Sequence, residues 1–168
     1  MTVNLEIRPE RAEDTAAIEA LTIAAFRAAP HADGTEQDVI AGLRAAGALT
    51  VSLVAVDGDR IVGHVAVSPV TISDGSSDWY GLGPISVAPE RQGQGIGSSL
   101  MAAAMEALRG LNALGCVLLG DPGYYARFGF RPLPSLTLPG ADPQYFQALP
   151  FTDRVPMGTV VYHAAFGS

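Results

Sequence analysis

The segment from Gln92 to Ser98 (QGQGIGS) contains three glycines at alternate positions and leads into an alanine-rich stretch typical of a helix. The first backbone N–H groups of a helix have no partner within it and lie at the positive end of its dipole, so they bind anions. A loop almost free of side chains lets a ligand approach these groups closely, because a Cβ atom at Gly95 or Gly97 would intrude on it. The sequence therefore predicts a phosphate-binding loop formed by the backbone from Gly93 to Ser98.

Two classes of nucleotide-binding loop fit this segment poorly. A Walker A loop needs a lysine after its last glycine, but Ser98 follows Gly97 and the sequence contains no lysine. A dinucleotide-binding loop of the pattern GxGxxG would need glycine in place of Ser98, although Asp121 after the next apolar run matches the acidic residue of that fold. That loop would also follow the first strand of its fold, whereas here a predicted hairpin precedes it. A nucleotide-dependent oxidoreductase is therefore the less favoured alternative.

Composition narrows the classes of protein further. A chain of 168 residues is most simply one domain, and its net charge of −7 argues against nucleic acid as a partner. No run of about 18 apolar residues is present, so we expect no membrane partner, and the first ten residues lack the pattern of a signal peptide. The single cysteine, Cys116, excludes an intramolecular disulfide and, within its apolar run, reads as a core residue. These features favour a cytoplasmic protein.

The first half of the sequence predicts the elements that precede the loop. Two amphipathic stretches read as helices, and Thr35 and Asp38 have the spacing of a capping box at the start of the second. Apolar runs on either side of the turn dipeptide Asp57–Gly58 predict a β-hairpin. In chain order these elements are a strand over Val3–Pro9, helices over 10–29 and Thr35–Gly47, and strands over Leu49–Val56 and Ile61–Ile72.

The second half places the loop between two buried strands. Leu82–Val87 precedes it, and Cys116–Gly120 follows the helix, which implies a parallel pair with a right-handed crossover. A short aromatic helix over Pro122–Phe130 and a last strand over Gly158–Ala164 complete the pattern, with a proline-rich tail between them. The order predicts an α/β (mixed α+β) fold, a central mixed sheet with helices on both faces.

Two motifs in order give the sequence a family resemblance. Gln92–Gly97 matches the pattern [QR]-x-x-G-x-[GA], and YYARFGF (Tyr124–Phe130) follows the next strand. Together with GPISVAPERQGQGIGSSLMAAAMEAL, they make the chain similar to GNAT-superfamily N-acetyltransferases. LGDPGYYARFGF further resembles a poorly characterised bacterial subgroup of predicted acetyltransferases. The resemblance implies a GNAT-like fold, with a mostly antiparallel sheet and one splayed parallel pair, forming a single N-acetyltransferase domain over residues 1–168.

The resemblance also implies acetyl-CoA as co-substrate, and no metal. In the family the pantetheine arm lies between the splayed strands, and Gly83-Pro84 fits an opening there because proline donates no ladder hydrogen bond. The predicted cofactor-binding segment after it begins with Ile85, Ser86 and Val87, where backbone groups of the first and third would pair with pantetheine and the Ser86 side chain would point the other way. The pyrophosphate would lie on Gln92, Gly93, Gln94, Gly95, Ile96, Gly97 and Ser98, with Gln92 standing where the family often has arginine.

For catalysis, the resemblance places Tyr125 near the thioester sulfur, where its phenol can donate a proton to the departing thiolate. Asp121 ends the strand beside the opening and is the leading candidate for the base; it also reads as the cap of the Pro122 helix. His64 reads as a core residue. The acceptor mouth is expected near Phe26, His31 and the segment Asp78–Tyr80.

The predicted activity is transfer of an acetyl group from acetyl-CoA to a primary amine, by direct attack of the amine on the thioester. The partner is then a small-molecule or peptide amine, and a two-fold homodimer is the default assembly. A non-catalytic acyl-CoA-binding module is the alternative, because the sequence leaves the base open between a side chain and water.

Overall fold

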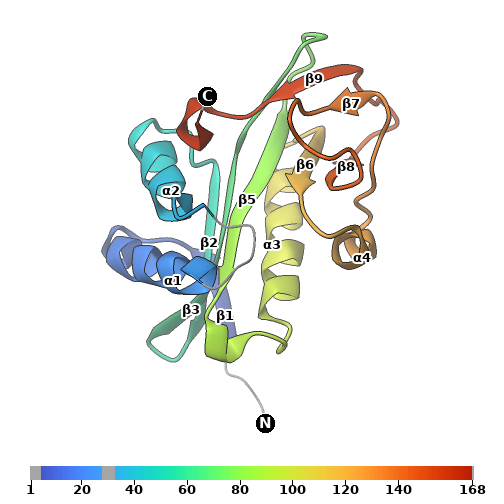
Figure 1. Cartoon of the computed structure of the whole chain (residues 1–168). Helices are drawn as coiled ribbons and strands as arrows, with labels where there is room; N and C mark the ends of the chain where they lie inside the picture. Colours follow the sequence, from blue (N-terminus) through green and yellow to red (C-terminus); the bar gives the residue numbers. More distant parts are fainter. Residues whose placement is uncertain (1–4, 28–32, 168) are drawn as a thin grey trace.

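The computed structural model describes residues 5–27 and 33–167. Within them, one sheet of six strands has the order β1-β2-β3-β5-β6-β8, and a second sheet of three short strands has the order β4-β9-β7. Helices α1 and α2 lie on one side of the main sheet and α3 lies on the other (Figure 1). Neighbouring strands of the main sheet are antiparallel except for the pair β5–β6, so the predicted fold class is confirmed.

The strands are β1 (Leu5–Pro9), β2 (Val51–Asp57), β3 (Arg60–Pro69), β4 (Thr71–Ile72), β5 (Trp79–Val87), β6 (Gly115–Leu119), β7 (Leu136–Thr137), β8 (Phe146–Pro150) and β9 (Gly158–Val161). The helices are α1 (Thr15–Arg27), α2 (Glu36–Ala45), α3 (Ile96–Gly110) and α4 (Pro122–Tyr125), with 3-10 turns at Ala12–Asp14, Pro89–Arg91, Ala126–Phe128 and Ala164–Phe166. No helix in the described ranges combines the length and the apolar character needed to cross a bilayer.

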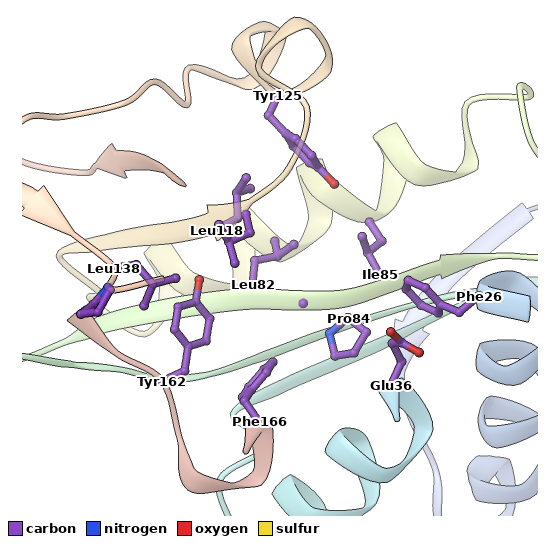
Figure 2. Close-up of a pocket in the computed structure, with 13 residues that line it drawn as sticks. Phe26, Glu36, Leu82, Pro84, Ile85, Leu118, Tyr125, Leu138, Tyr162 and Phe166 are labelled. Atoms are coloured by element: carbon purple, nitrogen blue, oxygen red, sulfur yellow. The ribbon is translucent and has the colours of Figure 1, made fainter. Parts of the chain in front are cut away.

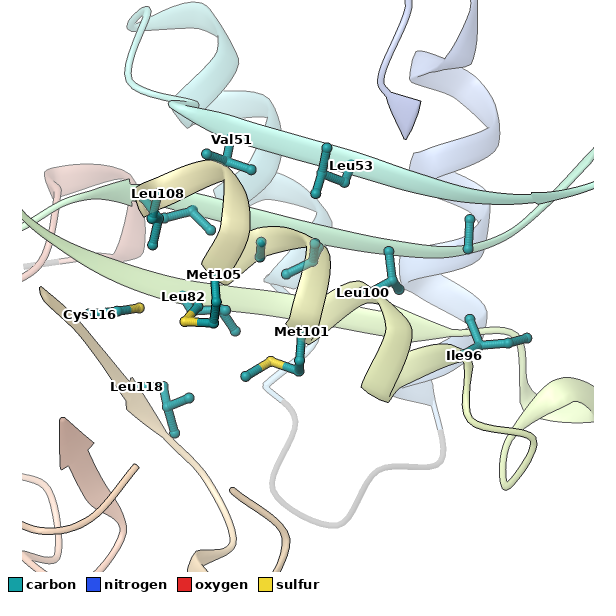
Figure 3. Packing of buried hydrophobic residues seen from close by; sticks show 14 of the residues in the cluster. Val51, Leu53, Leu82, Ile96, Leu100, Met101, Met105, Leu108, Cys116 and Leu118 are labelled. Atoms are coloured by element: carbon teal, nitrogen blue, oxygen red, sulfur yellow. The ribbon is translucent and has the colours of Figure 1, made fainter. Parts of the chain in front are cut away.

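Helix α3 is fixed on the sheet by one apolar stripe. Its buried residues recur three to five positions apart, as expected for one face of a helix. Figure 3 shows this stripe above β2, β3 and β5, and the sulfur of Cys116 lies in the same cluster. The stripe consists of Ile96, Leu100, Met101, Ala104, Met105 and Leu108. This packing sets the position of the glycine loop, because the loop leads directly into the first turn of α3.

The parallel strands β5 and β6 separate after a short stretch of pairing. Pairing runs from Trp79–Gly81 with Gly115–Val117 and then ends, although β5 continues to Val87. On its other edge β5 carries a bulge, where Gly83 and Pro84 stand opposite the single residue Ala66 of β3. The predicted opening at this proline is therefore present, and it leaves one edge of β5 unpaired.

Three details differ from the sequence-based expectations. The run expected as one strand over Ile61–Ile72 divides into β3 and β4, because Thr71 and Ile72 pair with β9 instead. The proline-rich tail contains β8, which extends the sheet beside β6. At the start of α2, the Thr35 side chain makes no capping hydrogen bond and donates to Asp33 at 2.6 Å instead, so the capping-box prediction is wrong.

Candidate active site

A cavity of about 740 Å³ lies where β5 and β6 separate. Residues from both faces of the sheet line it, so it passes through the opening rather than lying on one side (Figure 2). Most of the lining side chains are apolar, and the polar ones are Glu36, Tyr125 and Tyr162. A compartment lined by apolar groups with few polar ones is typical of a small-molecule site.

Tyr125 reaches the cavity from α4, and Figure 2 shows its hydroxyl pointing into it. The ring packs across the backbone at Gly120, where a Cβ atom would collide with it. Burial raises the pKa of the Tyr125 phenol to about 12, and the nearby Tyr124 and Asp121 add to the rise. The phenol is therefore protonated at neutral pH and is able to donate a proton.

The glycine loop forms a second pocket of about 310 Å³ at the start of α3. Gly95 precedes the first helical residue with φ +85°, a conformation that favours glycine, and no described atom lies within 4 Å of a Cβ placed there. At Gly97 a Cβ would come within 3.3 Å of the Tyr124 hydroxyl. The open space above the loop backbone fits a phosphate group on the helix N-terminus.

Comparison with known proteins identifies the family to which the chain belongs. The family described as "Acetyltransferase (GNAT) domain" matches residues 49–132, a segment that contains β5, the glycine loop, β6 and α4. The chain belongs to the GNAT acetyltransferase family.

Individual relatives agree with the assignment. The uncharacterized N-acetyltransferase YhbS of Escherichia coli K12 is 34% identical over 126 residues, which cover 74% of this chain and 72% of YhbS. A crystal structure of a Brucella melitensis GNAT family acetyltransferase in complex with acetyl-CoA is 48% identical, with a TM-score of 0.87 over 98% of this chain and 99% of that one. The structure of E. coli YhbS in complex with CoA gives a TM-score of 0.90 and 31% identity, over 100% and 94% of the two chains.

In this GNAT chain the predicted cofactor-binding residues divide between the central cavity and the loop pocket. Ile85 lines the central cavity and Val87 lines the loop pocket. Between them the Ser86 side chain is buried, as alternation along a strand requires. Gln92, Gly93, Gly95, Ile96, Gly97 and Ser98 line the loop pocket as well, whereas Gln94 lies outside its lining and accepts a hydrogen bond from Arg91 Nε at 3.0 Å.

Two arginines at the loop pocket were missed from the sequence. Arg91 lines it and forms an ion pair with Asp57, with Nη1 and Oδ2 2.9 Å apart. Arg127 lines it from the turn after α4, with its guanidinium 4.5 Å from the centre of the Tyr124 ring. Both place a guanidinium at the loop pocket, where Gln92 carries no charge, although Asp57 offsets the charge of Arg91. The position of Arg127, two residues after Tyr125 in the YYAR motif, could have pointed to it. Whether its side chain reaches the loop pocket, however, depends on how α4 packs, which the sequence does not give.

Asp121 has a structural task in this site. Its carboxylate caps α4 by accepting the Gly123 N–H at 2.8 Å, as the alternative reading of the sequence expected. It is exposed and lines a neighbouring depression rather than the cavity that holds Tyr125. Its role as the base stays a prediction.

Of the residues expected at the acceptor mouth, some line the central cavity and others do not. Phe26 lines the central cavity, and His31 lies outside the described residues. The segment Asp78–Tyr80 lies at the paired end of β5 and lines a separate depression beside β4, so it does not contribute to the cavity.

His64 is a core residue, as the sequence indicated, and it takes part in a buried polar network. It is fully buried, and its Nε2 lies 2.8 Å from Ser52 Oγ, which also donates to Glu10 Oε1 at 2.5 Å. Arg44 Nη2 binds the same Glu10 oxygen at 2.9 Å. Burial lowers the pKa of His64 to about 4, with Arg44 adding to the fall and Glu10 opposing it. The imidazole is therefore neutral at physiological pH and holds strands β2 and β3 to Glu10.

Proposed function

We propose that this chain, acting as a single domain, transfers the acetyl group of acetyl-CoA to a primary amine of a small molecule or peptide. The observation that carries the proposal is the protonated Tyr125 hydroxyl at the open end of β5, in a cavity that continues toward both faces of the sheet. A nucleophile can enter from one face while the leaving group lies at the other. The acetyl-CoA and CoA complexes of the two similar proteins support the choice of co-substrate.

Two parts of acetyl-CoA have candidate surfaces in the structure. The unpaired edge of β5 at Ile85 and Val87 would bind the amide groups of pantetheine in the manner of an added strand. The backbone from Gly93 to Ser98 would hold the pyrophosphate, with Arg91 and Arg127 adding positive charge.

The chemistry requires two proton movements. The amine nitrogen forms a bond to the acetyl carbon as the bond from that carbon to sulfur breaks. Tyr125 donates its proton to the departing thiolate, and the attacking nitrogen loses a proton to a base or to water. Asp121 is our candidate for that base, and it would act through water because its carboxylate lines the depression beside the central cavity and not the cavity itself.

Replacing Tyr125 with phenylalanine tests the proposal. The variant keeps the ring against Gly120 and removes only the proton donor, so turnover should fall by roughly 10²–10⁴-fold. Turnover is measured as free CoA released from acetyl-CoA over a panel of primary amines, and acetyl-CoA affinity by calorimetry should change little. Tyr145→Phe, at an exposed tyrosine, is the matched control and should keep full turnover.

The outcomes distinguish enzyme from binding module. Unchanged turnover in Tyr125→Phe, at an unchanged melting temperature, would remove Tyr125 from the mechanism. Tight acetyl-CoA binding without CoA release for any amine would instead favour a non-catalytic acyl-CoA-binding module.

A further inference from the structure

Glu36 brings a carboxylate into an otherwise apolar part of the central cavity. It is the charged side chain among the described residues that line the cavity. Its Oε2 accepts the Asp33 N–H at 3.2 Å. Its Oε1 is buried, and no described residue forms a hydrogen bond to it. A buried carboxylate oxygen without a partner is costly, so its presence indicates that something else binds there.

A second unpartnered polar atom lies in the same cavity. The hydroxyl oxygen of Tyr162 is buried and has no hydrogen-bond partner among the described residues. The Tyr162 ring lies against Gly81 and makes an edge contact with Phe166, with ring centres 5.1 Å apart. Burial raises the pKa of this phenol, so it stays neutral and can donate one hydrogen bond and accept another. Two polar atoms without partners in one cavity point to a ligand rather than to a packing defect.

Glu36 lies away from Tyr125. Figure 2 shows Tyr125 on one side of β5 and Glu36 and Phe166 on the other, with the Tyr162 ring drawn across the strand. Glu36 comes from α2, which covers the face opposite to α3 and its glycine loop (Figure 1). An acceptor bound on the Glu36 side would therefore face the thioester from the side opposite to the leaving thiolate.

The rest of this side of the cavity is apolar. Figure 2 shows Phe26 and Pro84 next to Glu36, with Phe166 beyond Pro84 in the same cavity. A ligand with one positive charge can satisfy the carboxylate and bury its remaining surface against these rings. A second charge would be desolvated with no partner among the described lining residues, which disfavours polyamines and aminoglycosides.

We propose that Glu36 binds the ammonium group of the acceptor, and that the acceptor is a monoamine carrying an aromatic or aliphatic group, with the Tyr162 hydroxyl as a second polar group farther along the same cavity. The proposal rests on the proposed function only in calling the bound amine an acceptor, because binding of the amine can be measured without turnover. The negative net charge of the chain favours the approach of such a cation.

The experiment measures binding to the protein loaded with CoA, which carries no acetyl group and so permits no reaction. Calorimetry compares benzylammonium with benzyl alcohol, which has nearly the same shape and no charge. The parent should bind benzylammonium more tightly, and Glu36→Gln should weaken that binding by at least about 30-fold while leaving benzyl alcohol unchanged. Asp38→Asn removes a carboxylate from the same first turn of α2 at an exposed position, so it is the matched control and should behave as the parent.

Three results would overturn the proposal. They are equal affinity of the parent for the amine and the alcohol, a preference for the amine that survives in Glu36→Gln, and tighter binding of putrescine than of benzylammonium. The first and third need no variant, so they hold even where Glu36→Gln folds poorly, and Glu36→Met gives a second uncharged variant. If Glu36-dependent binding is found but no amine releases CoA from acetyl-CoA, the proposed function fails while this proposal stands.

Discussion

Burial of His64 makes the stability of the fold depend on pH. The side chain, on β3, has no exposed surface and contacts Ser52 of β2. The charged groups that face it are Glu10, with an oxygen 4.0 Å from Nε2, and Arg44 beyond it. In the unfolded chain His64 binds a proton below about pH 6.5, whereas in the folded chain it does so only below about pH 4. Between these values protonation favours the unfolded state, so the free energy of unfolding falls as the pH is lowered.

The size of the effect follows from the pKa difference. Each pH unit in this window costs about 1.4 kcal/mol, so acidification from pH 6.5 to 4 removes about 3 kcal/mol of stability. Above pH 6.5 the contribution is fully present. Carboxylates with lowered pKa values, such as Glu10 and Asp14, also stabilise the fold. Their contribution to the free energy of unfolding is lost only as the pH falls below their pKa values in the unfolded chain, 4.5 and 3.8. The range from pH 4.5 to 6.5 therefore isolates His64 from them.

Urea unfolding at half-unit intervals between pH 4.5 and 7.5 measures this slope. His64→Gln cannot titrate and should flatten it, while His163→Gln, at the partly exposed histidine near the C-terminal end, should not. A parent whose stability is flat across the window would refute the argument, as would a slope that survives in His64→Gln. The imidazole pKa measured by NMR in the parent is an independent check, and a value near 6.5 would also contradict the reasoning.

Two further predictions concern the proposed reaction. Gly95→Val should abolish acetyl-CoA binding measured by calorimetry. The control is Gly75→Val, at a glycine with nearly the same φ (+84° against +85°) and equally open surroundings, which should lose as little melting temperature as Gly95→Val and keep the affinity for acetyl-CoA. Equal affinities in the two variants would contradict the pyrophosphate assignment. A rising limb in the pH profile of kcat/KM should persist in Tyr125→Phe and, if Asp121 is the base, vanish in Asp121→Asn. If both variants keep the limb, it belongs to the substrate amine or to another group.

Local sequence patterns predicted the part of the fold that carries the cofactor site. The glycine loop, the apolar stripe of α3 and the strands on either side are adjacent in sequence, so their spacing alone defines a strand–loop–helix–strand unit. Asp121 before Pro122 likewise predicted the cap that the structure contains. The opening at Gly83-Pro84 was readable because proline cannot donate a ladder hydrogen bond.

The C-terminal third was harder to read because its strands depend on distant partners. β8 (FQALP) is short and bounded by prolines and polar residues, and it is a strand because the edge of β6 is free to pair with it. β4, β7 and β9 are two to four residues each and form a sheet only with one another. No local periodicity predicts such strands, since short extended segments gain their stability from the partner.

The proposed acceptor side of the site was missed for a related physical reason. Glu36 stands in the first turn of a helix, where the helix dipole already favours an acidic residue. An acidic residue at that position therefore does not by itself indicate a ligand. Tyr162 stands at the end of a short strand and reads as an ordinary amphiphilic residue. Their significance depends on two atoms lacking partners in a cavity built from segments more than a hundred residues apart in the sequence. The cofactor half of the site can be read from one motif, whereas the proposed acceptor half is formed only once the chain has folded. Binding to Glu36 is therefore the more informative test of which acceptor this chain takes.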